Sequence, residues 1–128
     1  MDELTIGMTK EITASADESR LAVNVGSGTL RVLATPALAA LMEQAAWQLL
    51  QPYLSDDITT VGTNINIDHL RATPCGADIK VIAKLTAAEG RKYDFELEAY
   101  DKAGIIAKGK HTRFSVKAQR FMEKAEAT

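Results

Sequence analysis

The sequence has 128 residues, of which 46% are hydrophobic and 25% charged, and its formal net charge is −2. These values are typical of one globular domain spanning residues 1–128 with a sizeable core, and they give no basic surface that would favour nucleic acid. The single cysteine, Cys75, excludes an internal disulfide and favours a cytoplasmic protein. The acidic amino terminus and the lack of a long apolar run argue against a secretion signal or a membrane anchor.

Two short strands are expected in the amino-terminal part, because apolar and polar residues alternate weakly there. The first lies within Ile6 to Thr13 and the second covers Leu21 to Val25, with a polar turn at residues 15–19 between them. The run Gly26-Ser27-Gly28 predicts a flexible link, after which residues 29–34 lead into the next element.

One long apolar helix is predicted from Thr35 to Tyr53. Thr35 can cap the first free backbone N–H groups, Pro36 suits the first helical position, and the step into Pro52 ends the helix. Apolar side chains, Trp47 among them, cover most of the circumference, so the helix is expected to be buried on several sides.

Glu43 is the only acidic residue in this helix. One interpretation is that it shares a solvent-exposed stripe with Gln44, Gln48 and Gln51, because glutamate is rarely buried. The other is that it is a functional carboxylate in a mostly apolar cleft. The helical pattern leaves both interpretations open.

After the helix the pattern changes to a period of two, which predicts antiparallel strands with one buried face. The inward face of the first of these strands is expected to be Val61, Thr63, Ile65, Ile67 and His69. Two more strands follow around residues 78–85 and 92–99, and a long last strand covers Ile105 to Lys117. Residues 118–128 are expected to form a loose helical turn or a frayed tail.

A single helix against an antiparallel meander is an α+β arrangement. It resembles the hotdog fold, in which a curved antiparallel sheet wraps one long central helix. One edge of such a sheet would be free, and pairing with a second copy is a common way to cover an exposed edge. A homodimer is therefore expected.

Few residues of this sequence are suited to chemistry. His69 is expected to point toward the helix, either as a core histidine with a satisfied hydrogen bond or as a functional group, whereas the face on which His111 lies stays open. Thr35 and Glu43 are about 12 Å apart along the helix, so they flank a substrate from two sides or meet across a dimer interface. Gly62 interrupts its strand and marks a bulge or a close approach. No metal site is expected, because the histidines lack metal-ligand spacing.

Four segments of the sequence, VLATPALAALMEQAAW, VGTNINIDHLRATPCG, AEGRKYDFELEAYD and GKHTRFSV, carry a family resemblance. They are similar to the fluoroacetyl-CoA thioesterase-like branch of the hotdog thioesterases, over about Arg31 to Val116. The most specific parts are the spacing from threonine to glutamate in LATPALAALME and the segment HLRATPCG, which matches the family pattern His-x-x-Ala-Thr-Pro-x-Gly. The family's namesake has a longer, Phe-rich lid before the helix, whereas residues 24–30 of this chain are short and lack aromatic side chains.

The resemblance implies hydrolysis of a small acyl-CoA thioester. Carried over residue by residue, it places the catalytic threonine, carboxylate and histidine at Thr35, Glu43 and His69. It places the substrate-contacting glycine and arginine at Gly62 and Arg113. It implies no cofactor, since coenzyme A is part of the substrate, and acyl-CoA is the expected partner. The alternative is a non-catalytic hotdog dimer that binds an acyl-CoA or another small ligand.

Overall fold

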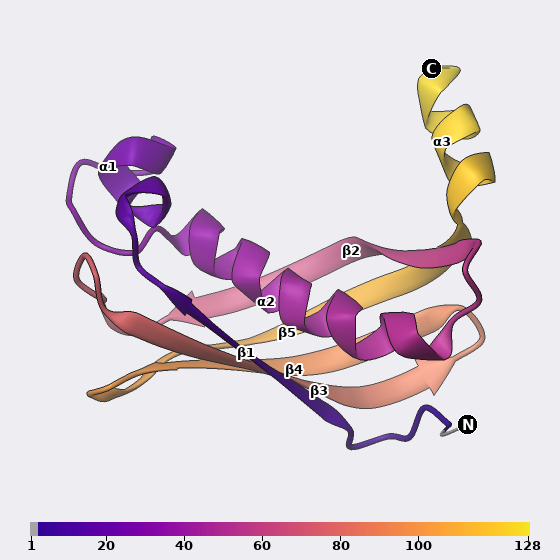
Figure 1. The fold of residues 1–128 in the computed structure, drawn as a ribbon, viewed down its shortest axis with the longest axis horizontal. Helices are drawn as coiled ribbons and strands as arrows, with labels where there is room; N and C mark the ends of the chain where they lie inside the picture. The colour runs from indigo at the N-terminus through magenta and orange to yellow at the C-terminus, as the bar shows by residue number, and fades with distance from the viewer. Residues whose placement is uncertain (1–2) are drawn as a thin grey trace.

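The computed structural model describes residues 3–128, which form one five-stranded sheet and three α-helices (Figure 1). The strands are β1 (Thr9–Ser15), β2 (Ile58–His69), β3 (Asp78–Glu89), β4 (Lys92–Asp101) and β5 (Gly104–Lys117). The helices are α1 (Ala22–Val25), α2 (Thr35–Leu50) and α3 (Ala118–Glu126), with 3-10 turns at Glu18–Arg20 and Gln51–Tyr53. The strand order is β1-β3-β4-β5-β2 and every neighbouring pair is antiparallel, so β1 and β2 are the edge strands.

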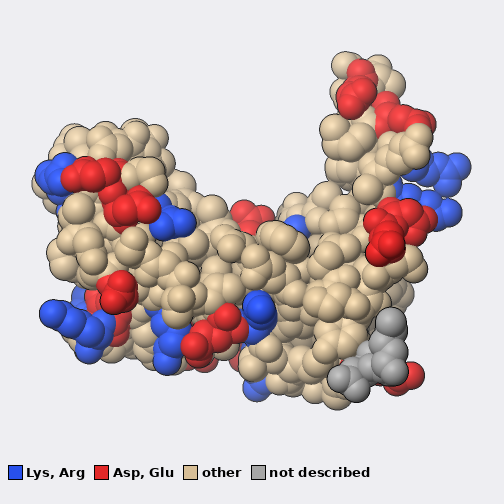
Figure 2. All heavy atoms as spheres, in the orientation of Figure 1, with Lys and Arg blue, Asp and Glu red and all other residues tan. Residues whose placement is uncertain are grey.

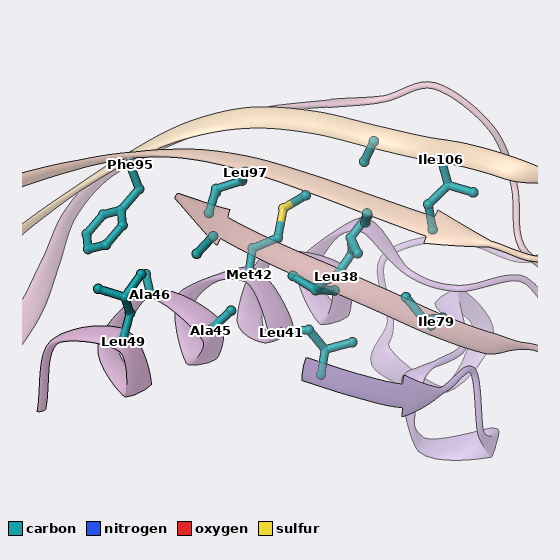
Figure 3. Packing of buried hydrophobic residues seen from close by; sticks show 14 of the residues in the cluster. Leu38, Leu41, Met42, Ala45, Ala46, Leu49, Ile79, Phe95, Leu97 and Ile106 are labelled. Carbon is teal, nitrogen blue, oxygen red and sulfur yellow. The ribbon is translucent and has the colours of Figure 1, made fainter. Parts of the chain in front are cut away.

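Helix α2 lies across one face of the twisted sheet (Figure 1), and the core fills the space between them. Figure 3 shows Phe95 and Leu97 of β4 pointing toward the helix, on the side where Met42 and Leu49 point back. Burial of each such side chain stabilises the fold by about 1.5–3 kcal/mol, which fixes the helix on the sheet. The predicted α+β arrangement, with one long helix against an antiparallel sheet, is confirmed.

One side of α2 is not covered by the sheet. Trp47, predicted to be part of the buried surface, is 39% exposed, and the side chain of Glu43 is 41% exposed. Both lie on the same side of the helix, one turn apart, and this side is next to β2. Figure 2 shows that the molecule is hollowed between α1 and α3, above the edge that β2 forms in Figure 1. The five strands of one chain therefore leave this side of the helix open.

Two other segments differ from the sequence predictions. Leu21 to Val25 is not a strand, because Ala22–Val25 form one helical turn that closes with a hydrogen bond from the Gly26 N–H to the Ala22 carbonyl. Leu21 and Ala22 are adjacent and both buried, which does not fit a strand with one buried and one exposed face. Residues 118–126 form a nine-residue helix, longer than the expected loose turn. No helix among the described residues is long and apolar enough to cross a membrane.

Candidate active site

Strand β2 carries two groups of candidate residues, one toward each end. His69 at its carboxyl end meets Thr35 at the start of α2, and we call these two residues the hydroxyl–imidazole pair. The other group surrounds a glycine in the first half of the strand, and we call it the arginine cluster. Its members are Gly62, Glu43, His111 and Arg113.

The hydroxyl–imidazole pair is joined by a short contact, with Thr35 Oγ1 2.7 Å from His69 Nδ1. The ring points toward α2 as predicted, and its Nε2 is buried without a hydrogen-bond partner among the described residues. Burial lowers the pKa of His69 below its usual value, against a smaller opposing effect of the Arg71 backbone. A pocket of about 310 Å³ opens beside the pair, lined in part by Leu70. The pair therefore offers a neutral imidazole that can take up or release a proton next to a cavity.

The prediction that Thr35 caps the helix is wrong. Ala34 is the N-cap residue and has no side-chain oxygen, and the first helical hydrogen bond runs from the Leu38 N–H to the Ala34 carbonyl. Thr35 is thus inside the first turn, and its hydroxyl is used by His69 instead. The helix start holds the hydroxyl in place without consuming it as a cap.

A β-bulge in β2 decides which residues of its first half face the helix. The pairing with β5 shifts between Gly62 and Asn64, so Thr63 is the extra residue. Directly paired residues share a face, and Gly62 pairs with the inward-facing Arg113. The sequence pattern placed Gly62 on the outer face and Thr63 on the inner one; the bulge reverses this, because one extra residue inverts a period of two.

Gly62 lies so close to the other members of the arginine cluster that a larger residue would collide with them. A Cβ atom at this position would be 2.6 Å from Glu43 Oε2, 3.1 Å from His111 Cε1 and 3.3 Å from Arg113 Nη1. The sequence predicted either a bulge or a close approach at Gly62, and the structure has both. The bulge directly follows Gly62, and the carboxylate of Glu43 lies against its backbone. Arg113 Nη1 is 3.7 Å from the same Glu43 oxygen.

Arg113 is held by a nearly complete set of partners. Its Nε and Nη2 donate to the side chain and the carbonyl of Thr60, both at 2.9 Å, and its Nη1 is 3.2 Å from His111 Nε2. His111 Nδ1 lies 2.7 Å from the Asn64 carbonyl, which only accepts, so Nδ1 carries the proton and Nε2 accepts from Arg113. Burial lowers the pKa of His111 and the charge of Arg113 acts in the same direction, against smaller opposing effects of the hydrogen bond to the Asn64 carbonyl and of the Glu43 charge. A neutral His111 therefore supports the guanidinium that faces Glu43.

Sequence reasoning left the face of His111 open, although one signal was available. Arg113 is two residues further along the same strand, and residues two apart share a face. Once the resemblance placed Arg113 at the substrate, His111 had to lie beside it. Glu43 also fits neither of its two interpretations fully, because its side chain is partly exposed yet points at Gly62 and Arg113.

The two groups lie far apart in one chain. Thr35 and Glu43 are eight residues apart on α2, about 12 Å along its axis, and Gly62 and His69 are separated by roughly 23 Å of strand. The structure therefore brings Gly62, Glu43 and Arg113 together, and separately Thr35 and His69, but not all five residues.

Two further observations bound the chemistry. No group of three or more His, Cys, Asp or Glu side chains within residues 3–128 is arranged to hold a metal ion. Cys75 is exposed, and its sulfur lies near Glu18 and Arg31 rather than near a histidine. The carboxylate, hydroxyl and imidazole groups of the two clusters are thus the strongest candidates for chemistry.

The fold and this set of residues together define the hotdog class of thioesterases. The chain belongs to the family of fluoroacetyl-CoA-specific thioesterases, whose model matches residues 16–119. The fluoroacetyl-CoA thioesterase of Streptantibioticus cattleyicolor is 34% identical over 93 residues, which are 73% of this chain and 67% of that protein. The predicted family and the prediction of a thioester hydrolase are confirmed by this membership.

Solved structures support the same conclusion. A structure of the fluoroacetyl-CoA thioesterase FlK superimposes with a TM-score of 0.95 at 26% identity, covering 99% of this chain and 98% of the other. A single-residue variant of FlK in complex with fluoroacetate and CoA matches with a TM-score of 0.88 at 26% identity, over 92% and 99% of the two chains. A hot-dog-like protein from Thermanaerovibrio acidaminovorans has a TM-score of 0.87 at 20% identity, over 95% and 90% of the chains, and supports the fold alone. The hotdog fold is confirmed.

Proposed function

We propose that this chain hydrolyses small acyl-CoA thioesters to the free acid and CoA. The observation that carries the proposal is the partly exposed carboxylate of Glu43, which lies against the backbone of Gly62 and is held there by Arg113. A carboxylate with a fixed orientation beside a β-bulge is suited to attack an acyl carbonyl or to activate water. The structure of the FlK variant with fluoroacetate and CoA supports the acyl-CoA class of substrate.

The proposed reaction assigns a role to each candidate residue. Glu43 takes a proton from a water molecule that attacks the thioester carbonyl carbon, or attacks this carbon itself, and the carbon–sulfur bond then breaks. In the second case an anhydride between Glu43 and the acyl group forms, and water hydrolyses it to release the acid and restore the carboxylate. His69, neutral at physiological pH, moves the proton that the departing thiolate needs. Thr35 orients the acyl group, and Gly62 and Arg113 fix the position of Glu43. Water supplies the second oxygen of the acid, so CoA takes part only as a portion of the substrate and not as a cofactor.

The same proposal includes a homodimer. Two copies of β2 related by a two-fold axis run antiparallel, so the His69 end of one strand passes along the Gly62 end of the other. This pairing would join the hydroxyl–imidazole pair of one subunit to the arginine cluster of its partner. Exposed apolar side chains lie on elements around the hollow and support its burial; they include Val23, Val25, Trp47 and Leu70.

The cytoplasm remains the expected compartment within this proposal. Cys75 is a free, exposed thiol, and exposed thiols persist in a reducing environment. The amino-terminal residues Met1 and Asp2 lie outside the described residues.

Thiol release from a panel of acyl-CoA thioesters, short to long and aryl, tests the function. Wild type is expected to release CoA from at least one short acyl thioester, and Glu43→Gln is expected to lose this activity while keeping its melting temperature. Tight binding of acyl-CoA without any thiol release would contradict hydrolysis and would favour the non-catalytic binding module.

A further inference from the structure

A second pocket, of about 350 Å³, lies where α3 leaves the sheet, beyond the residues placed in the candidate site. Its lining includes Ile58, Arg91, Lys117, Arg120, Phe121 and Lys124. Figure 2 shows Lys and Arg atoms gathered beside the base of α3. No acidic side chain of the described residues lines this pocket. We call it the basic pocket.

The basic side chains of this pocket are free to meet a ligand. None of the four forms an ion pair with a described residue, and Arg91 makes only a long contact, 3.5 Å from its Nη1 to the Ser115 carbonyl. Asp57, Glu89 and Glu123 are within two residues of lining residues in the sequence, but none of the three lines the pocket. A site with four unpaired cations favours a ligand with several negative charges.

Helix α3 and Lys117, the residue just before it, present basic side chains on one face. Lys117, Arg120, Phe121 and Lys124 follow the spacing i, i+3, i+4, i+7, which places them along one stripe. Glu123 and Glu126 fall outside this stripe. Phe121 is 41% exposed although it is a large aromatic residue. An aromatic ring between cations can stack on a nucleobase while the cations bind phosphates.

The basic pocket is connected to the arginine cluster by both the helix and the sheet. Glu43 and Trp47 of α2 and Gln51, which directly follows this helix, are spaced four residues apart and share a side. Gln51 Nε2 donates to the carbonyl of Ile58 at the pocket wall, 2.8 Å away. This route covers about 12 Å of helix axis. Along β5, Lys117 comes four positions after Arg113, which is a distance of roughly 13 Å. The pantetheine arm of CoA has about as many main-chain bonds as four residues of extended polypeptide, so it spans a similar length.

We infer that the basic pocket binds the 3′-phospho-ADP end of a CoA thioester whose acyl end lies at Glu43, an inference that rests on the proposed function. Arg120 and Lys124 contact the phosphates, and Phe121 stacks on the adenine. The concave shape and the volume of the pocket suit a nucleotide. A substrate carried on a carrier protein has a phosphopantetheine group without a nucleotide, so the pocket favours CoA thioesters over such substrates.

Binding of free CoA, 3′-dephospho-CoA and pantetheine by calorimetry tests the inference without any turnover. We expect wild type to bind CoA at least about tenfold more tightly than pantetheine, with 3′-dephospho-CoA in between. The double variant Arg120→Ala/Lys124→Ala is expected to lose most of this preference. The charge-retaining variant Arg120→Lys/Lys124→Arg should keep most of it. Lys108→Ala/Lys110→Ala, which removes two positive charges from another part of β5, should keep it fully.

Equal binding of CoA and pantetheine by wild type would overturn the inference, and so would an unchanged preference in the Arg120/Lys124 double alanine variant. Efficient hydrolysis of acyl-pantetheine, with kcat/KM equal to that for acyl-CoA, would also overturn it and would favour a carrier protein. If CoA binds through the basic pocket but no acyl-CoA is hydrolysed, the proposed function fails while the binding site stands. Measurement of thiol release with the same samples therefore separates the two failures.

Discussion

The two ends of β2 hold their polar groups in different ways. At the Gly62 end, Arg113 is 6% exposed and its three guanidinium nitrogens all have partners, so the position of Glu43 is determined by a fixed frame. At the other end, Thr35 is exposed and meets His69 through one contact, and the second nitrogen of that ring has no partner among the described residues. The hydrogen-bonded Arg113 is suited to holding Glu43 in position, whereas the His69 ring, with one nitrogen free, is suited to proton transfer.

The largest effect is expected from Glu43→Gln. The amide keeps the shape of the side chain but neither attacks a carbonyl nor takes a proton from water, so kcat/KM should fall by about 10³-fold. The melting temperature should change little, because this side chain is partly exposed. Thiol release and thermal unfolding measured on the same sample check both points. Glu96→Gln, a carboxylate on β4 outside the candidate site, is the matched control and should retain activity.

A mixture of two inactive variants distinguishes a site within one chain from a site shared between subunits. Thr35→Ala damages the hydroxyl–imidazole pair, and Glu43→Gln damages the arginine cluster. If each site takes one group from each subunit, half of the randomly assembled dimers are mixed and each has one intact site, so co-expression should restore about one quarter of wild-type activity. Separate affinity tags on the two chains allow the mixed dimer to be purified and assayed. Activity no higher than the average of the two variants alone would contradict the shared site.

Two glycines on neighbouring strands give a matched pair of substitutions with different expected outcomes. In Gly62→Ala the new Cβ meets the far end of the Glu43 side chain at 2.6 Å, which can move aside. The fold should survive, with about a tenfold loss of kcat. In Gly109→Ala the new Cβ meets the Asn66 carbonyl oxygen at 2.5 Å, and backbone cannot move as easily. This variant should lose about 1–3 kcal/mol of unfolding free energy instead.

Urea unfolding and steady-state kinetics of both glycine variants check this division. A stable but slow Gly62→Ala together with an unstable Gly109→Ala is the expected result. If Gly62→Ala retains full activity, the close contact with Glu43 has no part in turnover.

Most of the fold could be predicted because its pattern is strong. Helix α2 and strands β3 to β5 have long apolar periods, and their inward faces follow from the sequence. The predictions that failed concern segments in which one residue or a few residues decide the local structure. One extra residue at Thr63 reverses the first half of β2, and the four residues Ala22–Val25 are too few for alternation to distinguish a strand from a helical turn.

The candidate site was predictable in its residue types and less so in its arrangement. The resemblance supplied Thr35, Glu43 and His69, but spacing alone does not reveal that they form two separate groups. The support of Arg113 by His111 depends on a tautomer that is fixed by one backbone carbonyl, and a sequence does not encode such a contact in any local pattern.

The smallest effect is expected from a change of pH on the unfolding free energy, and it should come mainly from His111 of the arginine cluster. Burial lowers the pKa of His111 below the ordinary value near 6.5, so below that pH the unfolded chain takes up a proton that the folded chain does not. The unfolding free energy should therefore be highest above pH 6.5 and should fall as the pH is lowered, by at most about 1.4 kcal/mol per pH unit for one histidine.

The substitution His111→Gln separates this contribution from that of His69, whose pKa burial also lowers. A glutamine amide can donate to the Asn64 carbonyl and accept from Arg113, so the frame keeps its hydrogen bonds but loses its titrating group. Urea unfolding at pH 7.5, 6.5 and 5.5 should show a shallower decline for this variant than for wild type. Parallel declines in the two proteins would mean that His111 takes up a proton in the folded state. In that case Nε2 could no longer accept from Arg113, and the fixed frame around Glu43 would not hold at acid pH.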